Sequence, residues 1–595
     1  MKMKNSELLK AFRYVWKNQR IWVLFSALIS LFMGLIPITN LWVVKELINE
    51  VAAVLGGAKQ EYTASFLLLL AQFALLFVSS AVLKGQELLD KQTEIKLDHD
   101  LQQMVMQKTS SAPLAFYDVP AFHDTIERVY TGHGIRFMQP VKNIFEIGRY
   151  FTTLLSFFAF LLSVHWGLVL VSLAGSIPVL LVLVRFGNQR FHLRFHQTPL
   201  AREASYLKHL LIDRQAAKEV RLFQMKEFLL RGWSDKYRKN SQELLKLTRR
   251  EKLAMIGMDG LTALFYVSAA GLIIWLARTT KVTIGDFVAL GQAVQGTQGA
   301  MNGIVTHLAR IHETRLYIRE FFQFIELDLS AYEIKRGTAP FPRPLETGIT
   351  VDNLSFCYPG SERYTLRNVS FSISPGERIA IVGENGSGKT TLVKCLMGLY
   401  RLSEGQIRFD GLPLEEIGES EFFRNLTVIF QDFMHYDFTV RENISIGQLE
   451  AAADLERVKR AAQKSGADRF VQRMADGYDT YLGRSFRDGE DLSGGQWQKV
   501  ALARALFSDG QVIILDEPTA ALDPRAEMEV FQKFDQLTQN STAVFISHRM
   551  AAARMADRIL VMKDGALLES GSHEELMALG GEYQRMYDMQ AKWYV

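Results

Sequence analysis

The chain has 595 residues, 48% of them hydrophobic, which is long enough for two or more domains. A formal net charge of +4 is too small to indicate a nucleic-acid-binding protein, so no nucleic-acid partner is expected. The two cysteines, Cys357 and Cys395, both lie in the C-terminal half; they imply no disulfide framework and fit a reducing cytosolic location for that half.

Six apolar runs in the N-terminal half approach the roughly 20 residues that a helix needs to cross a bilayer. The apolar core of the third run is short, and we expect its helix to begin nearer Ile144. Amide side chains interrupt the sixth run. Buried helices of a soluble domain are an improbable alternative for six such runs. The first is too long for a signal-peptide core. We therefore predict an α-helical transmembrane domain with six spans, at Ile21–Val44, Phe66–Leu83, Phe151–Val164, Leu168–Val184, Leu253–Ala277 and Ile284–Val305.

Basic residues predict the orientation of these spans. Because lysines and arginines concentrate on the cytoplasmic side, the N-terminus should be cytoplasmic. Six crossings return the chain to that side. The segments 84–149 and 185–252 are long, charged and helical in pattern, whereas the joints near His165 and at 278–283 are short. The basic residues before the first span are Lys2, Lys4, Lys10, Arg13, Lys17 and Arg20.

Three prolines mark a linker after the last span. Pro340, Pro342 and Pro344 stand in a stretch without helical or strand periodicity. We predict a transmembrane domain at 1–328, a linker at 329–348 and a second domain at 349–588.

A glycine-rich loop in the second domain predicts phosphate binding. An apolar strand, Arg378–Val382, precedes it and a helical pattern, Thr391–Met397, follows. A strand–loop–helix of this form directs backbone N–H groups and a helix N-terminus at an anion. Lys389 would contact the β- and γ-phosphates and the Thr390 hydroxyl would bind Mg²⁺. The nucleotide-binding candidates here are Gly383, Glu384, Asn385, Gly386, Ser387, Gly388, Lys389, Thr390 and Thr391.

Further motifs restrict the kind of nucleotide-binding protein. Tyr358 stands before the loop and Gln431 after it, in Ile429-Phe430-Gln431-Asp432. LSGGQ follows at Leu492–Gln496, then an apolar strand running into Asp516 and Glu517, and a second strand ending at Ser547-His548. From residue 349 onward the chain resembles an ATP-binding-cassette (ABC) ATPase. The resemblance implies an α/β P-loop ATPase domain that hydrolyses ATP with Mg²⁺.

The resemblance assigns a role to each motif. Asp516, Thr390 and Gln431 would hold Mg²⁺, while Glu517 is the general base or water-positioning group. His548 would contact the γ-phosphate. Tyr358 would stack on adenine, although an ordinary strand aromatic stays open as an alternative. The expected catalytic residues are therefore Glu517, His548, Gln431 and Lys389.

LSGGQ predicts a dimer. It offers a serine hydroxyl and glycine N–H groups at a helix start, which is a second anion site. In the family this motif completes the ATP site of the facing subunit. Each chain holds one of each half, so we expect a homodimer, with a heterodimer of two half-transporters left open. The residues of this second half-site are Ser493, Gly494, Gly495 and Gln496.

A membrane domain fused ahead of the ATPase resembles the exporter class of ABC transporters, in a bacterial cytoplasmic membrane. The segments 115–120 and 218–223 lie where that class places its coupling helices. The sequence around LSGGQ, including Leu482-Gly483 and Trp497-Gln498-Lys499, resembles nisin-type lantibiotic exporters, which implies a peptide cargo. A multidrug or lipid exporter is the alternative. The chain departs from the common exporter pattern at Arg484 and Ala520, neither of which removes a catalytic group.

One face of the sixth run is polar. Gln292, Gln295, Gln298 and Asn302 are spaced by three and four residues, so they share a helical face. Polar groups at membrane depth are tolerated where they face a cavity or bond to another helix. The sequence leaves both readings open, a lining of the transport pathway and interhelical hydrogen bonding. Asp259 in the fifth run is a charge that should find a partner or a wet cavity, with a position near the cytoplasmic end of the span as the alternative.

Overall fold

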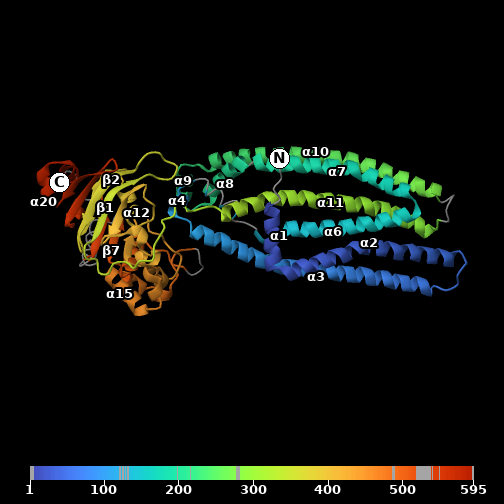
Figure 1. Cartoon of the computed structure of the whole chain (residues 1–595), viewed down its shortest axis with the longest axis horizontal. Helices are drawn as coiled ribbons and strands as arrows, with labels where there is room; N and C mark the ends of the chain where they lie inside the picture. The colour runs from blue at the N-terminus through green and yellow to red at the C-terminus, as the bar shows by residue number, and fades with distance from the viewer. Residues whose placement is uncertain are drawn as a thin grey trace. The chain divides into compact units, whose positions relative to one another are not determined.

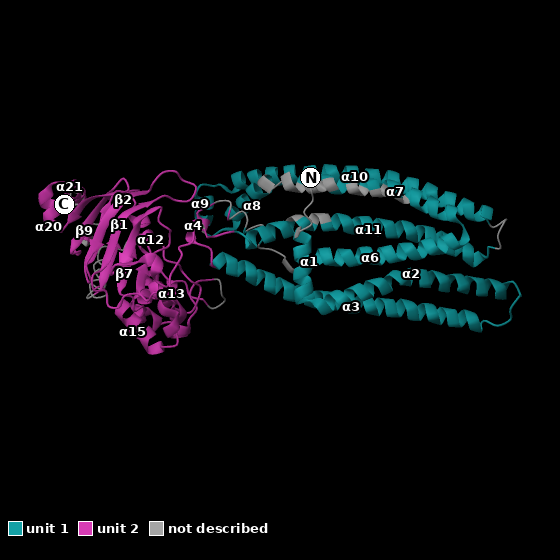
Figure 2. Cartoon of the chain, viewed as in Figure 1, with its two compact units in different colours: residues 1–110, 124–327 teal, residues 111–123, 328–595 magenta. Residues whose placement is uncertain are grey.

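A computed structural model of the chain describes all residues except 1–5, 120–121, 123–125, 127–128, 130–132, 197, 215, 277–281, 331, 485–488, 517–537, 539–540, 548–549 and 592–595. The chain forms two compact units (Figure 2). Unit 1 comprises residues 1–110 and 124–327, and unit 2 comprises residues 111–123 and 328–595. Unit 2 therefore includes a short segment from the first half of the chain, which no sequence motif indicates.

Unit 1 is built from long helices (Figure 1). Contacts join α6 to α2, α3 and α11, and join α7 to α10 and α11, so these helices form one bundle. Its helices are α1 (Ser6–Asn18), α2 (Arg20–Leu55), α3 (Thr63–Ser110), α6 (His133–Val164), α7 (Trp166–His196), α8 (Thr198–Ile212), α9 (Ala217–Leu222), α10 (Lys226–Leu276) and α11 (Ile284–Ile325).

Each predicted span falls in one of the long helices. By length and hydropathy, four helical segments in the described part of the chain can cross a membrane, namely Arg20–Leu55, Thr63–Ser110, Arg136–Val164 and Lys226–Leu276. In α7 a shorter apolar stretch, Trp166–Gly175, meets the hydropathy level, and α11, with its amides, is not among the four. The prediction of apolar spanning helices is confirmed for these four, and the total of six stays a prediction.

The apolar side chains of unit 1 point both inward and outward. Leu161, Leu168 and Leu290 are fully buried in the bundle, while Phe66 and Phe73 of α3 are each 69% exposed. Exposed apolar residues of this size and number are too many for a surface in water. These side chains suit a helix that faces lipid. The backbone of such a helix can lie in lipid because its hydrogen bonds are all made within the helix.

Unit 2 contains two sheets. Strands β1 (Ile349–Phe356), β2 (Leu366–Ile373), β4 (Glu404–Phe409) and β5 (Leu412–Pro413) form an antiparallel sheet in the order β2-β1-β4-β5. The second sheet has the order β10-β9-β3-β8-β7-β6. Its strands are β3 (Arg378–Gly383), β6 (Leu426–Ile429), β7 (Val512–Asp516), β8 (Thr542–Ile546), β9 (Arg558–Lys563) and β10 (Ala566–Gly571). All pairs are parallel except β9 with β10.

Four hydrophobic clusters lie among the described residues of unit 2, and two of them hold the helices that carry the predicted motifs. One surrounds the sheets and includes Leu392 of α12, Ile514 of β7 and Ala115 of the inserted segment. The other is helical and includes Val440, Val458 and Trp497. The helices are α4 (Leu114–Tyr117), α12 (Lys389–Leu396), α13 (Glu419–Arg424), α14 (Val440–Ser445), α15 (Leu455–Ser465), α16 (Asp468–Val471), α17 (Gly494–Phe507), α19 (Met550–Ala553), α20 (His573–Leu579) and α21 (Glu582–Ala591), with the 3-10 turns η1 (Leu414–Glu416), η2 (Ile446–Ala451) and η3 (Gly477–Asp479).

Candidate functional site

The glycine-rich loop joins β3 to α12 in a conformation that only glycine tolerates at two positions. Gly383 has φ +150°, and a Cβ there would lie 2.2 Å from the Met562 carbonyl oxygen. Gly388, the N-cap of α12, has φ +99°, and its Cβ would lie 2.8 Å from Leu366 Cδ2. A side chain at either position would clash with backbone or core atoms and strain the loop.

Two buried polar groups line this loop. The Lys389 side chain folds back over it, and its Nζ donates to the carbonyl oxygens of Gly383 at 2.9 Å and Glu384 at 3.0 Å. Ser387 is buried, and its Oγ has no hydrogen-bond partner among the described residues. A buried hydroxyl without a partner costs free energy. The loop thus offers a cation and a spare hydroxyl donor, a combination that is suited to an anion.

The remaining loop residues differ in exposure. Glu384, Asn385 and Gly386 are exposed, Thr390 is half-buried and Thr391 is buried. The loop leads into the start of α12, and the backbone N–H groups at a helix start favour phosphate.

Parallel strands bring further polar residues to the same edge of the sheet. Asp516 is the last residue of β7, is buried, and pairs in register with Ile546 of β8. Ile546 also pairs with Ile381 of β3, two residues before Gly383. Gln431 follows β6 by two residues and is exposed. Because the carboxyl ends of parallel strands share one edge, Asp516 and the phosphate loop lie there together.

Two predicted catalytic residues, one acidic and one a histidine, directly follow strand-end residues in the sequence. Glu517 follows Asp516 and His548 follows Ser547, and both lie outside the described residues. So do Ala520 and Phe486. Their expected roles stay predictions.

Tyr358 lies just beyond β1 and is half-buried. Its hydroxyl is 3.1 Å from Thr391 Oγ1, and its ring packs edge-on against Phe356 and Tyr400 at centroid distances of 5.1 and 5.5 Å. The residue is therefore tied to the phosphate loop, which an isolated strand aromatic would not need.

LSGGQ begins α17. Ser493 is the N-cap: its Oγ accepts from the Gln496 N–H, and the Gln496 side-chain oxygen accepts from the Ser493 N–H at 2.8 Å, a reciprocal capping box. Ser493 and Gly494 are exposed, Gly495 is half-buried, and nothing lies within 4 Å of a Cβ built at Gly494. α17 belongs to the helical cluster, whereas α12 belongs to the cluster around the sheets. Capping of α17 therefore explains why Ser493 and Gln496 stand at these positions, but it does not explain why Gly494, where a side chain would fit, is a glycine.

Sequence reasoning missed several residues that shape the site. Arg585 of α21 forms an ion pair with Glu384 at 3.0 Å. The Gly565 N–H donates to the Ser387 carbonyl oxygen at 3.2 Å. Tyr400, buried beside Tyr358, donates to Asp118 Oδ2 at 2.7 Å. No motif marks these residues, because each contact joins distant parts of the chain.

Burial also sets the chemistry of the cysteine in α12. Cys395 is fully buried, and burial raises the pKa of its thiol to about 12. The thiol therefore stays protonated and packs as an apolar group.

In unit 1 the predicted polar face divides. Gln292, Gln295 and Asn302 are exposed on α11, but Gln298 is buried and its Nε2 has no hydrogen-bond partner among the described residues. Asp259 is exposed on α10. Short helices, α4 and α9, occur at both predicted coupling segments.

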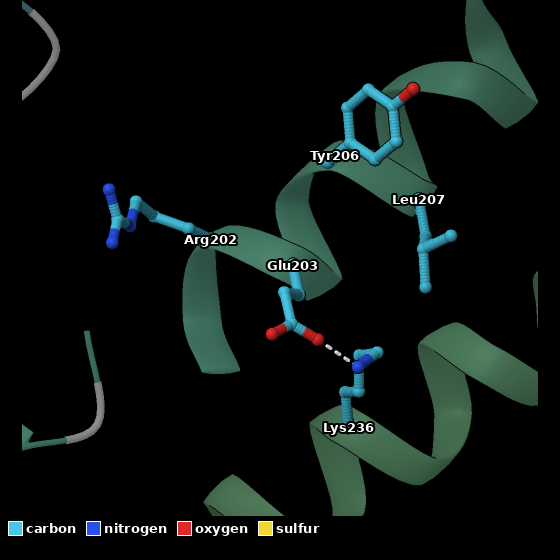
Figure 3. A pocket seen from close by; sticks show the side chains of 5 residues that line it. All are labelled: Arg202, Glu203, Tyr206, Leu207 and Lys236. Carbon is cyan, nitrogen blue, oxygen red and sulfur yellow. Dashed lines mark hydrogen bonds and ion pairs between the residues drawn. The ribbon is translucent and has the colours of Figure 1, made fainter. Parts of the chain in front are cut away.

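A hollow of about 410 Å³ lies between α8 and α10 (Figure 3). Glu203 and Lys236 form an ion pair across it, and none of the predicted site residues lines it. Its lining is Arg202, Glu203, Tyr206, Leu207 and Lys236.

Comparison with known families matches both units. The model of the ABC transporter transmembrane region matches residues 22–301, and the ABC transporter model matches residues 366–520. A solved structure, a bacterial Atm1-family ABC exporter with ATP bound, shares the fold with a TM-score of 0.77 over 97% of this chain and 99% of that one, at 23% identity. The chain belongs to the ABC transporter family, as an exporter with fused membrane and ATPase domains.

Curated relatives of similar length sharpen this assignment. The chain is 31% identical to the subtilin transport ATP-binding protein SpaT of Bacillus subtilis, over 97% of this chain and 93% of the relative. It is 29% identical to the nisin transport ATP-binding protein NisT of Lactococcus lactis subsp. lactis, over 97% and 94%. It is also 31% identical to an ATP-dependent lipid A-core flippase of Pseudomonas aeruginosa, over 83% and 80%. The predicted exporter class, the resemblance to nisin-type exporters and the two-domain fold are confirmed. The protein binds and hydrolyses ATP, couples hydrolysis to transport and resides in a membrane.

Proposed function

We propose that this chain is a homodimeric exporter of a peptide across a bacterial cytoplasmic membrane, with its N-terminus and unit 2 in the cytoplasm. The observation that carries the peptide assignment is the match to the subtilin and nisin transport proteins over 97% of the chain. The lipid A-core flippase matches over a smaller share, 83%.

The phosphate loop supplies the nucleotide site. Lys389 and the backbone N–H groups of Gly386–Thr391 bind the β- and γ-phosphates, and Tyr358 stacks on adenine with its hydroxyl held by Thr391. The Ser387 hydroxyl, which has no hydrogen-bond partner in the described part of the chain, is the kind of buried donor that a phosphate oxygen satisfies.

The oxygen donors at the sheet edge fit Mg²⁺. Thr390, Asp516 and Gln431 offer a hydroxyl, a carboxylate and an amide oxygen, which are hard ligands of the kind this ion prefers. Bound there, Mg²⁺ would neutralise charge on the phosphates. Glu517 positions and deprotonates the attacking water, and His548 contacts the γ-phosphate.

The two ATP sites are shared between identical chains. Ser493, Gly494 and Gly495 of one chain close over the nucleotide held by Lys389 of the other, while Gln496 shapes the helix start. The exposure of Ser493 and Gly494 supports this, because a motif used only for capping could keep its glycines buried. A heterodimer with a second half-transporter is the alternative.

The exposed amides of α11 line the pathway. Gln292, Gln295 and Asn302 lie at helical spacings of three and four with Gly299 between them, so this exposed strip carries three amides and no apolar side chain. A peptide needs such hydrogen-bonding walls, because burying an unpaired amide in a dry site costs several kcal/mol. Gln298, which is buried, belongs to helix packing instead.

The test is ATPase activity of the reconstituted protein with a leader-bearing lantibiotic-type peptide, phospholipids or hydrophobic dyes. We expect the peptide to stimulate hydrolysis. Gln295→Leu should weaken this stimulation at unchanged thermal stability, whereas Gln298→Leu, the matched buried variant, should alter stability first. Stimulation by phospholipids or dyes alone, insensitive to Gln295→Leu, would replace the peptide assignment by a lipid or multidrug exporter.

A further inference from the structure

The phosphate loop carries an acidic residue at the place where it should bind an anion. From Gly383 to Thr391 the sequence holds one carboxylate, Glu384, and one ammonium, Lys389. The backbone carbonyl oxygen of Glu384 accepts from Lys389 Nζ at 3.0 Å. Because a glutamate side chain is short, its carboxylate lies at most about 10 Å from that ammonium. Phosphates bound by Lys389 would therefore lie within about one Debye length of a second negative charge, close enough to be repelled.

A cation from the C-terminal end of the chain faces this carboxylate. Arg585 Nη2 of α21 donates to Glu384 Oε1 at 3.0 Å, and the two side chains are 54% and 62% exposed. An ion pair with this exposure contributes little to the stability of a fold. Attachment of α21 to the loop is therefore a weak explanation for the pair, whereas neutralising a charge beside bound phosphate is a direct one.

Other contacts hold α21 beside the loop (Figure 2). Tyr583 and Met586 of α21 are buried in one cluster with Val382 of β3, the strand that leads into the loop. At the start of α21, the Glu569 carboxylate accepts from the Tyr583 N–H at 3.0 Å. These contacts fix the helix without the ion pair, so losing the pair should leave α21 in place.

A second acid directs Arg585 toward the loop. Glu582, one turn earlier on α21, pairs with Arg585 at 2.5 Å and with Lys563 of β9 at 3.3 Å. Burial raises the pKa of Glu582, but hydrogen bonds from Arg585 and Lys563 outweigh it, so the net pKa is lowered and the carboxylate is charged near neutral pH. Lys563 neutralises Glu582, which leaves the charge of Arg585 to neutralise Glu384.

We propose that Arg585 is a positioning residue that holds and neutralises the Glu384 carboxylate, so that the phosphate loop can accept the phosphates of ATP. The proposal rests on the proposed binding of nucleotide by residues 383–391. Without the guanidinium, the Glu384 charge would repel the phosphates and weaken ATP binding. The ground state and the transition state would be repelled to a similar extent, so the effect belongs to KM rather than to kcat.

A role limited to attaching α21 makes a different prediction. In that case Arg585→Gln and Glu384→Gln break the same contact, and both should weaken ATP binding. Neutralisation predicts opposite outcomes, because Arg585→Gln leaves an uncompensated negative charge whereas Glu384→Gln removes it. The two explanations therefore differ in the sign of the effect of Glu384→Gln.

The experiment uses the full-length protein in phospholipid vesicles. The KM and kcat of MgATP hydrolysis are measured at about 50 mM and about 300 mM salt, which lie on either side of physiological screening. Arg441 of α14 provides the matched control, because it is also exposed and pairs with an acid, Asp479, at 3.2 Å, in the part of unit 2 that belongs to the helical cluster.

We expect Arg585→Gln to raise the KM for ATP about threefold at the lower salt concentration, with kcat changed less than about twofold. The increase should shrink at the higher concentration, because salt screens the repulsion. Glu384→Gln should keep the KM at or below that of the parent, and adding it to Arg585→Gln should return the KM to within about 1.5-fold of the parent. Arg585→Lys, which keeps the charge, and Arg441→Gln should leave the KM close to the parent value.

An unchanged KM in Arg585→Gln, a raised KM in Glu384→Gln, or an equal rise in Arg441→Gln overturns the role of Arg585. Should Arg585→Gln fail to fold, Glu384→Gln decides alone, since only attachment predicts a rise. Lys389→Ala separates this inference from the proposed function. Parent-like hydrolysis in Lys389→Ala overturns the nucleotide site and the inference with it, whereas lost hydrolysis there with an unchanged KM in Arg585→Gln overturns the inference alone.

Discussion

Apolar side chains are buried in the strands of unit 2 but exposed on the helices of unit 1. In unit 2, Ile379, Ile381 and Ile514 lie in parallel strands and are at most 1% exposed. In unit 1, Leu70 and Phe73 of α3 are 68% and 69% exposed. The same side-chain chemistry closes a core in water and opens a surface to lipid. Burial therefore locates the site in unit 2 but cannot locate a pathway in unit 1, where exposed polar residues are the informative exceptions.

The comparison places the chemistry in unit 2, so the largest expected effect comes from a substitution in unit 2 that stops ATP hydrolysis and leaves unit 1 unchanged. Glu517→Gln keeps the shape of the side chain but removes the base, so ATPase activity should fall by at least about 100-fold while ATP binding persists. Activity is measured by phosphate release and binding by a fluorescent ATP analogue. Near-normal turnover would contradict the role of Glu517.

A mixed dimer tests whether unit 2 works only in pairs. Ser493→Arg and Lys389→Ala should each be inactive alone. In a mixed dimer one site carries both changes and the other carries none. If subunits pair at random and one intact site suffices, an equal mixture should regain about one quarter of the parent ATPase activity. Full activity in either single variant would argue against shared sites.

The smallest expected effect concerns the attachment of the linker to unit 2. Burial raises the pKa of Asp410, but hydrogen bonds from the backbone N–H groups of Glu346, Gly348 and Thr347 outweigh it, so the net pKa is lowered. The carboxylate therefore adds stability above the unfolded-state pKa of about 3.9, and this contribution is lost as pH falls through the lower folded pKa.

Asp410→Asn should lower the unfolding midpoint of unit 2 by about 2–4 °C at pH 7, the scale of roughly 1 kcal/mol in a domain of this size for a group that is partly solvent-screened. The difference from the parent, followed by circular dichroism, should begin to shrink as the pH falls below the unfolded-state pKa of about 3.9. Asp352→Asn, which loses only an exposed pair with Arg408 at 3.9 Å, is the control and should change little. A difference that stays constant as the pH falls below about 3.9 would contradict the account of Asp410.

Local motifs explain why much of unit 2 could be predicted. The conformations of Gly383 and Gly388 and the position of Asp516 at the end of β7 follow from short stretches of sequence with strict steric and chemical demands. The hydrogen bond between Tyr400 and Asp118 could not be predicted, because 282 residues separate its partners and only the fold joins them.

The polar face and the number of spans in unit 1 were harder to predict from the sequence, for a different physical reason. Helical periodicity placed Gln292, Gln295, Gln298 and Asn302 on one helical face, but it could not separate the three exposed amides from Gln298, which packs inward against neighbouring helices. Neighbouring helices cover part of a helical face, so the strip that stays exposed is narrower than the face that periodicity predicts. The number of spans is also hard to predict, because the amides of α11 lower its hydropathy.

The central claim is that ATP hydrolysis in unit 2 drives a peptide through unit 1. Inside-out vesicles holding the parent protein should accumulate a labelled leader-bearing lantibiotic-type peptide when ATP is added, and vesicles with Lys389→Ala should not. Accumulation of the peptide that is equal in both, or none in the parent while ATP drives phospholipid between leaflets, would contradict the claim.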